Sequence, residues 1–140
     1  RATQARTSAT LAEAASQETR DAITRVLTVV DLQRAIALIE RLKALHRDNK
    51  WDASLGHYQD LRAMLADIDA RHPAPTPELH TTLREAIVQI RVIEDSVDRA
   101  LRDNTEPSGA RNFNRGLNTV QVGLEQIASS THFPGSEANR

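Results

Sequence analysis

The stretch WDASLGHYQDLRAMLADI, residues 51–68, decides the fold class of this chain. Its apolar side chains recur at every third or fourth position, which places them on one face of an α-helix. Residues 110–129 repeat the spacing, and segments 20–46 and 77–103 also carry apolar faces. The two clearest faces consist of Trp51, Leu55, Tyr58, Leu61, Leu65 and Ile68, and of Phe113, Leu117, Val120, Leu124 and Ile127. We therefore predict an all-α fold, an antiparallel up-down four-helix bundle with a long N-terminal helix.

Breaker residues separate the predicted helices. Arg47–Lys50 forms a short polar turn, and three prolines within residues 71–77 forbid a helix there. Thr76 is placed to cap the third helix, with Pro77 in its first turn. Connections this short favour antiparallel neighbours. The first helix is longer than its partners, so we expect its N-terminal part to protrude.

Residues 1–20 read as a helical lead-in or stalk, residues 21–129 as the bundle, and residues 130–140 as a disordered tail. Thr10 and Glu13 have the spacing of a capping box, which predicts a helix start near Thr10. In the first strong helix, the apolar face shifts around Val30–Asp31. Either the helix is kinked there, or it contacts neighbours on two sides. We assign its apolar positions, which include Ile23, Val26, Leu27, Val30, Leu38 and Leu42, to the core.

Composition narrows the class of protein. The chain has 140 residues, enough for one domain, and a formal net charge of −1. It has no cysteine, which excludes disulfides and thiolate chemistry. Its cations are scattered rather than clustered, so we expect no binding to duplex nucleic acid. Residues 51–107 carry an acidic excess that suits either a basic partner or the basic first helix of a second copy of the chain.

No catalytic or cofactor motif interrupts the apolar faces. His57 and Asp60 lie three positions apart on one helix face, so they could bind a metal ion together. The same spacing is common on solvated helix faces, which is the interpretation that we prefer. Glu94, Asp95 and Asp98 are interleaved with arginines, which indicates a solvated face with ion pairs. We predict no enzyme activity, no metal and no cofactor.

The start of the fourth helix is the candidate ligand site. Arg111, Asn112 and Arg115 follow Ser108-Gly109, where free backbone amides and two guanidinium groups favour an anion. Asn114 and Asn118 lie in the same segment. The alternative is a capped, polar first turn that binds nothing.

Trp51 and Tyr58 are the large amphipathic aromatics of the chain, and they share a helix face. Such residues are enriched at interfaces, so the pair is a candidate interaction surface. The alternative is that the two side chains fill the end of the bundle with their polar atoms at its rim.

Residues 38–73 resemble a single tetratricopeptide-type helical hairpin. Ile39-Glu40-Arg41-Leu42 with Leu45-His46 is similar to its first helix, Asn49–Leu55 with Tyr58 to its turn and second helix, and Pro73 closes the unit. The resemblance implies two antiparallel helices. It implies no peptide-binding groove, because such arrays need about three stacked units.

The opening RATQARTSATLAEAA is similar to the helix that follows a membrane anchor in many small bacterial membrane proteins. This resemblance implies a cytoplasmic domain tethered to the inner membrane through residues before Arg1. We therefore expect a non-enzymatic interaction or sensory domain whose partner is a protein or a second copy of the chain. The alternative is a ligand-sensing domain that binds a nucleotide or other small anion at the fourth helix.

Overall fold

The computed structural model describes residues 2–71 and 77–130. The predictions for Thr76 as a cap and for a disordered tail over residues 131–140 lie outside these residues, whereas Ser130, the first residue of the predicted tail, is the last residue of a helix. The described residues form helices and no strand, which confirms the all-α prediction. The elements are α1 (Ala2–Arg47), α2 (Trp51–Arg71), α3 (Pro77–Arg102) and α4 (Ala110–Ser130).

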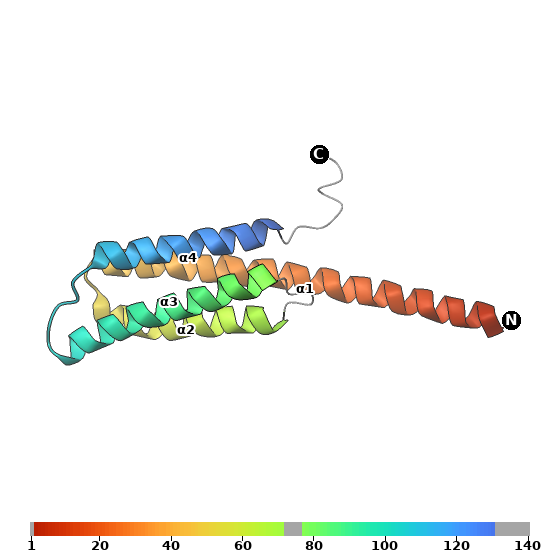
Figure 1. The fold of residues 1–140 in the computed structure, drawn as a ribbon, viewed down its shortest axis with the longest axis horizontal. Coiled ribbons are helices and arrows are strands. Elements are labelled where there is room, and N and C mark those ends of the chain that lie inside the picture. The colour runs from red at the N-terminus through yellow and green to blue at the C-terminus, as the bar shows by residue number, and fades with distance from the viewer. Residues whose placement is uncertain (1, 72–76, 131–140) are drawn as a thin grey trace.

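The helices pack side by side around one core (Figure 1). Helix α1 contacts α2 and α4, and α3 contacts the same two helices. Polar pairs show how neighbours are oriented: Lys43 meets Gln121, whereas the later residue His46 meets the earlier residue Asn114. This order places α1 antiparallel to α4.

The core begins well inside α1. From Leu32 onward, each helix contributes buried aliphatic side chains, with Leu65, Ile90 and Leu124 fully enclosed. The main contributors are Leu32, Ile39 and Leu42 of α1; Leu61, Leu65 and Ile68 of α2; Leu83, Ile90 and Val97 of α3; and Leu117, Val120 and Leu124 of α4. The periodicity of the sequence therefore locates the core correctly in α2, α3 and α4.

Two helices end in the same way. Asn49 and Asn104 adopt left-handed backbone, with φ of 56° and 54°. The next amides donate back across the turn, from Lys50 to Leu45 O at 2.9 Å and from Thr105 to Ala100 O at 2.8 Å. This Schellman geometry satisfies carbonyls at the C-termini of α1 and α3.

Helix α1 differs from the prediction at its N-terminal end. It runs without a break from Ala2 to Arg47, so the predicted helix start near Thr10 is wrong. Thr10 is not a cap, because its hydroxyl donates to Arg6 O at 2.8 Å inside the helix. The chain before Thr10 contains three alanines, two arginines and a glutamine among nine residues, which are good helix formers, so the helix has no reason to begin at Thr10. Of the two explanations for the shift at Val30–Asp31, contact with neighbours on two sides agrees with the structure.

The N-terminal half of α1 extends beyond the other helices (Figure 1). Ile23, Val26, Leu27 and Val30 are therefore exposed, by 54, 45, 49 and 42%, and their assignment to the core is wrong. The physical reason is that α2 ends at Arg71, whose guanidinium pairs with Asp31, so α2 does not cover the earlier turns of α1. None of the described helices combines the length and apolarity that crossing a bilayer requires.

Candidate functional site

Three arginines converge where α1 ends and α4 begins. Arg47 lies in the last turn of α1, and Arg111 and Arg115 lie at the start of α4. Together with Ala110, Asn114 and Asn118 they line a hollow of about 440 Å³. All three guanidinium groups are exposed, and no ion pair joins any of them to another residue in the described ranges. The hollow therefore gathers positive charge from three arginines.

The structure brings together part of the predicted anion site. Arg111 and Arg115 both line the hollow, whereas Asn112 is exposed and does not. One position on a helix turns a side chain by about 100°, which places Asn112 away from the side of α4 that lines the hollow. Sequence reasoning missed Arg47. One signal could have found Arg47: in an up-down bundle the first helix ends beside the start of the fourth, so residues at these two ends lie close together.

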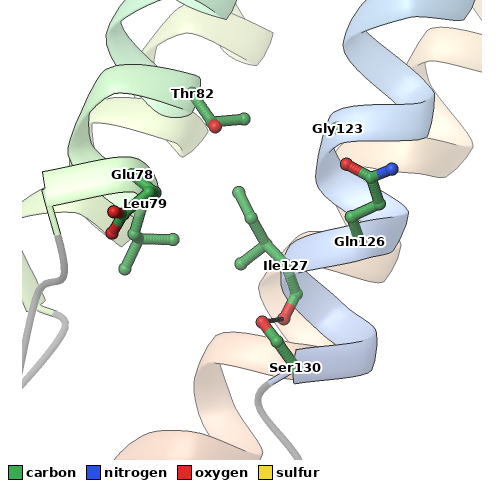
Figure 2. A pocket seen from close by; sticks show the side chains of 7 residues that line it. All are labelled: Glu78, Leu79, Thr82, Gly123, Gln126, Ile127 and Ser130. Atoms are coloured by element: carbon green, nitrogen blue, oxygen red, sulfur yellow. Dashed lines mark hydrogen bonds between the residues drawn. The ribbon is translucent and has the colours of Figure 1, made fainter.

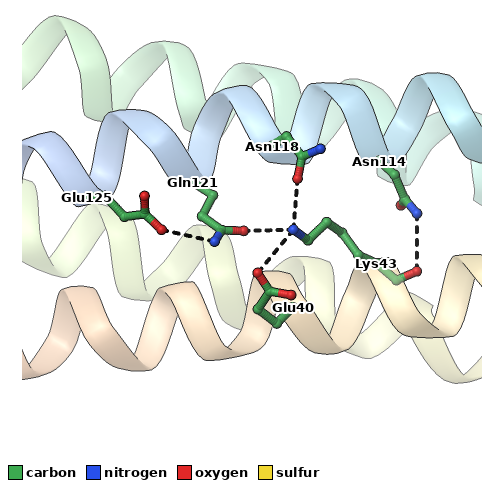
Figure 3. Close-up of polar contacts among 6 residues, drawn as sticks. All are labelled: Glu40, Lys43, Asn114, Asn118, Gln121 and Glu125. Atoms are coloured by element: carbon green, nitrogen blue, oxygen red, sulfur yellow. Dashed lines mark hydrogen bonds and ion pairs between the residues drawn. The ribbon is translucent and has the colours of Figure 1, made fainter.

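A buried lysine lies beside the hollow. Figure 3 shows Lys43 reaching from α1 to α4, where its Nζ donates to Asn118 Oδ1 at 2.8 Å and to Gln121 Oε1 at 2.9 Å. The ion pair with Glu40 measures 3.1 Å, and the hydrogen bond from Lys43 lowers the pKa of Glu40. Lys43 is only 9% exposed, so these polar partners offset the loss of its hydration. An anion bound in the hollow would therefore lie next to the hydrogen bonds by which Lys43 of α1 holds α4.

His46 lies deeper, fully enclosed. Its Nδ1 is 2.8 Å from Asn114 Oδ1, and its Nε2 is hydrogen-bonded to the Tyr58 hydroxyl. Asn114 Nδ2 donates to Lys43 O at 3.2 Å, which fixes its Oδ1 as an acceptor. His46 Nδ1–H therefore donates to Asn114, and Tyr58 O–H donates to His46 Nε2.

Burial fixes the charge states of this cluster. It lowers the pKa of His46, and it raises the pKa of Tyr58 to about 12. Both groups are therefore neutral at neutral pH. The positive charge of the region comes from Lys43 and the three arginines.

Trp51 and Tyr58 form no exposed interaction surface. Trp51 is 4% exposed and stacks on the His46 ring, with centroids 4.9 Å apart, while Phe113 meets it edge-on at 6.0 Å. The two aromatics fill the bundle end, as the alternative interpretation has it, but their polar atoms are buried and do not lie at its rim. Trp51 Nε1 has no hydrogen-bond partner among the residues that the structure describes.

One of the acidic residues that the sequence places on a solvated face is instead mostly buried, in an ion pair between two helices. Arg62 Nη2 donates to both carboxylate oxygens of Glu94, at 2.6 and 3.0 Å, and both side chains are mostly buried. Glu94 is therefore not on a solvated face as predicted, whereas Asp98 is, paired with Arg102 at 2.9 Å. Within residues 2–71 and 77–130, no group of three or more His, Asp or Glu side chains is arranged to hold a metal ion.

A shallow groove separates the start of α3 from the end of α4. Figure 2 shows Leu79 and Ile127 on its two sides, with polar side chains around them. Its volume is about 270 Å³. At Gly123 a Cβ would lie 3.1 Å from Thr82 Cγ2, so the small residue lets the two helices approach each other closely. The groove holds no pair of groups suited to acid–base chemistry among those that line it.

Several large apolar side chains of α1 are exposed close together on one helix face. Ala22, Ile23, Val26 and Leu27 line an almost purely apolar hollow of about 230 Å³. Val88, Val92 and Val122 are the other large aliphatic side chains exposed on described parts of α3 and α4. Comparison with known proteins found no protein family, no curated protein and no solved structure that matches the chain.

Proposed function

We propose that this chain is an up-down antiparallel four-helix bundle that works as a non-enzymatic interaction domain, with the exposed apolar face of α1 as its contact surface. The observation that carries the proposal is the exposure of Ile23, Val26, Leu27 and Val30 on a helix that leaves the bundle. Grouped exposed apolar side chains mark sites of interaction in soluble domains. The cytoplasmic, membrane-tethered setting stays a prediction.

The buried polar cluster supports a structural rather than a catalytic role for its residues. Both ring nitrogens of His46 are engaged, with Asn114 and with Tyr58, and the side chain has no solvent exposure. A histidine that acts as a general base needs a ring nitrogen within reach of a substrate proton. The cluster instead ties α1 to α2 and α4, which holds the bundle as a rigid body from which the N-terminal half of α1 extends.

Photo-crosslinking tests the contact surface. A benzophenone amino acid replaces Val26, and a matched control replaces Val88, which is exposed on α3 at 62%. We expect a protein adduct at Val26 and not at Val88 in cells that produce the chain. Without any adduct at Val26, or with equal adducts at both positions, the proposed contact surface is wrong.

An anion-sensing role is the second candidate, favoured by the hollow that Arg47, Arg111 and Arg115 line. In this role a nucleotide or similar anion binds the guanidinium groups and shifts α4, because Asn114 and Asn118 belong both to the hollow and to the bonds with α1.

Thermal unfolding with inorganic pyrophosphate and nucleoside triphosphates tests this candidate. An anion at about a hundred times its dissociation constant adds about 2.7 kcal/mol to the free energy of unfolding. We expect Arg115→Ala to abolish that gain and Arg91→Ala, on an exposed position of α3, to keep it. Equal stabilisation of both variants, or none of the wild type, contradicts the anion site.

A further inference from the structure

The exposed part of α1 carries an unbroken seam with a spacing of four and three residues. Every side chain of the seam is exposed, and none is charged. The seam consists of Ala5, Ala9, Ala12, Ser16, Thr19, Ile23, Val26 and Val30. A period of 3.5 residues is the spacing with which two helices wind around each other as a left-handed coiled coil. The seam is the continuation of α1 beyond the bundle, where no other described helix covers it (Figure 1).

The sizes of the seam residues favour one orientation of a second helix. Small residues occupy the N-terminal half of the seam and β-branched residues the C-terminal half. If an identical helix lies antiparallel, Val30 faces Ala5 of the second copy, Val26 faces Ala9, and Ile23 faces Ala12. Large side chains then oppose small ones in these layers, which lets them interdigitate. A parallel pair would instead set Ala against Ala or Ser against Ser over half of the seam and leave little apolar area to bury there.

The charges beside the seam favour the same alignment. In this register Glu13 of one copy flanks Arg20 of the other, and the symmetry of the dimer forms the pair twice. Arg6 flanks Leu27 of the second copy, where its aliphatic stem can cover the exposed leucine. In a parallel pair, Glu13 would flank Ser8 and Arg20 would flank Ala15, so no charge would find its opposite. Volume and charge thus select the same antiparallel register independently.

We infer that the exposed half of α1 pairs with the same segment of a second copy of the chain, antiparallel, with Thr19 of each copy facing Ser16 of the other at the centre. The inference rests on the proposed function, since it names the partner of the α1 contact surface. The paired segments end where the core of each bundle begins, because Val30 faces Ala5 and the core starts at Leu32.

Sedimentation equilibrium of the whole chain tests the pairing. We expect a dimer whose dissociation constant rises with Val26→Glu but not with Val88→Glu, which adds the same charge to an exposed valine of α3. Circular dichroism controls for folding, because Val26 lies outside the core. A chain that stays monomeric at millimolar concentration overturns the inference. If the photo-crosslink at Val26 still captures a different protein, the proposed contact surface stands while self-pairing falls.

A charge swap tests the register. Glu13→Arg and Arg20→Glu should each weaken the dimer about tenfold, because each places like charges together at two symmetric positions. The double variant should restore the wild-type dissociation constant at low salt. Residues 13 and 20 are two turns apart on one helix, so they cannot pair within a single copy. A double variant as weak as either single variant contradicts the register.

Spin labels test the orientation, since the chain has no cysteine of its own. Gln17→Cys and Thr10→Cys place labels on exposed positions of the same helix face. In the antiparallel dimer the two labels at position 17 are nearly level, whereas those at position 10 are separated along the axis by about 15 residues, or about 22 Å. A parallel dimer would give the same distance at both positions, and that result overturns the inference.

Discussion

Removing the Tyr58 hydroxyl should show how much the buried polar cluster stabilises the bundle. Tyr58 is fully buried, and its O–H donates to His46 Nε2. Tyr58→Phe keeps the ring and its packing but leaves Nε2 without a donor inside the core. A buried polar atom without its partner costs about 1–3 kcal/mol. For a chain of this size, about 2 kcal/mol lowers the melting temperature by about 6–8 °C.

A second substitution separates the hydrogen bond from other effects. When both partners of a buried hydrogen bond become apolar, no unpaired atom remains between them. We therefore expect His46→Phe combined with Tyr58→Phe to cost less than the sum of the two single variants, by about 1 kcal/mol. The coupling energy isolates the interaction of the two side chains.

Urea unfolding followed by tryptophan fluorescence measures these free energies. Trp51 is the one tryptophan of the chain, and it stacks on the His46 ring, so its emission reports on the cluster itself. The measurement is made at pH 8, where His46 is neutral in both folded and unfolded chains. A Tyr58→Phe variant as stable as the wild type, or single effects that simply add, would refute the hydrogen-bonded cluster.

Three further predictions concern stability. Burial holds the pKa of His46 below its ordinary value of 6.5, so the folded chain binds fewer protons than the unfolded chain as the pH falls. The stability that depends on a neutral His46 is therefore fully present above about pH 6.5 and is lost as the pH falls through the lowered pKa. Urea titrations at several pH values measure this loss. Gly56 lies inside α2 with open space around a Cβ, so Gly56→Ala should raise the free energy of unfolding by about 0.5–1 kcal/mol, and a lower melting temperature would contradict this. Glu94→Ala should cost about 1–3 kcal/mol because it leaves the mostly buried Arg62 unpaired, whereas Asp98→Ala, in a more exposed pair, should cost less than about 0.5 kcal/mol; similar losses would argue against a role for burial.

The sequence predicts the helix boundaries closely because turn chemistry is local. The starts expected at Trp51, Pro77 and Ala110 agree with the structure. Each follows a segment whose residues disfavour helix, such as the prolines before Pro77 or Gly109 before α4, where φ is +105°. Thr10 shows the limit of local reasoning. A capping residue is read as a helix start only when the chain before it is a poor helix former, and here it is not.

Periodicity identifies a helix face but not what covers it. Ile23, Val26 and Val30 recur with the same helical spacing as the buried apolar residues around Leu42, yet they lie on the part of α1 that extends beyond the bundle and are exposed. Its exposure depends on where α2 ends, which is information from another helix. For the same reason, Arg47 was missed at the hollow, because it is distant in sequence from Arg111 and Arg115. The burial of His46 also depends on partners in α2 and α4 that no short sequence window contains.

Hydrogen exchange at high and low protein concentration tests most directly whether the exposed face of α1 is the contact surface. Each amide of α1 reports on its own segment, so the exposed half and the half inside the bundle are compared in one sample. We predict that concentrating the protein slows exchange over residues 5–30 and leaves residues 32–47 unchanged. Slowing confined to α3 around Val88, or exchange over residues 5–30 that does not depend on concentration, would contradict the account.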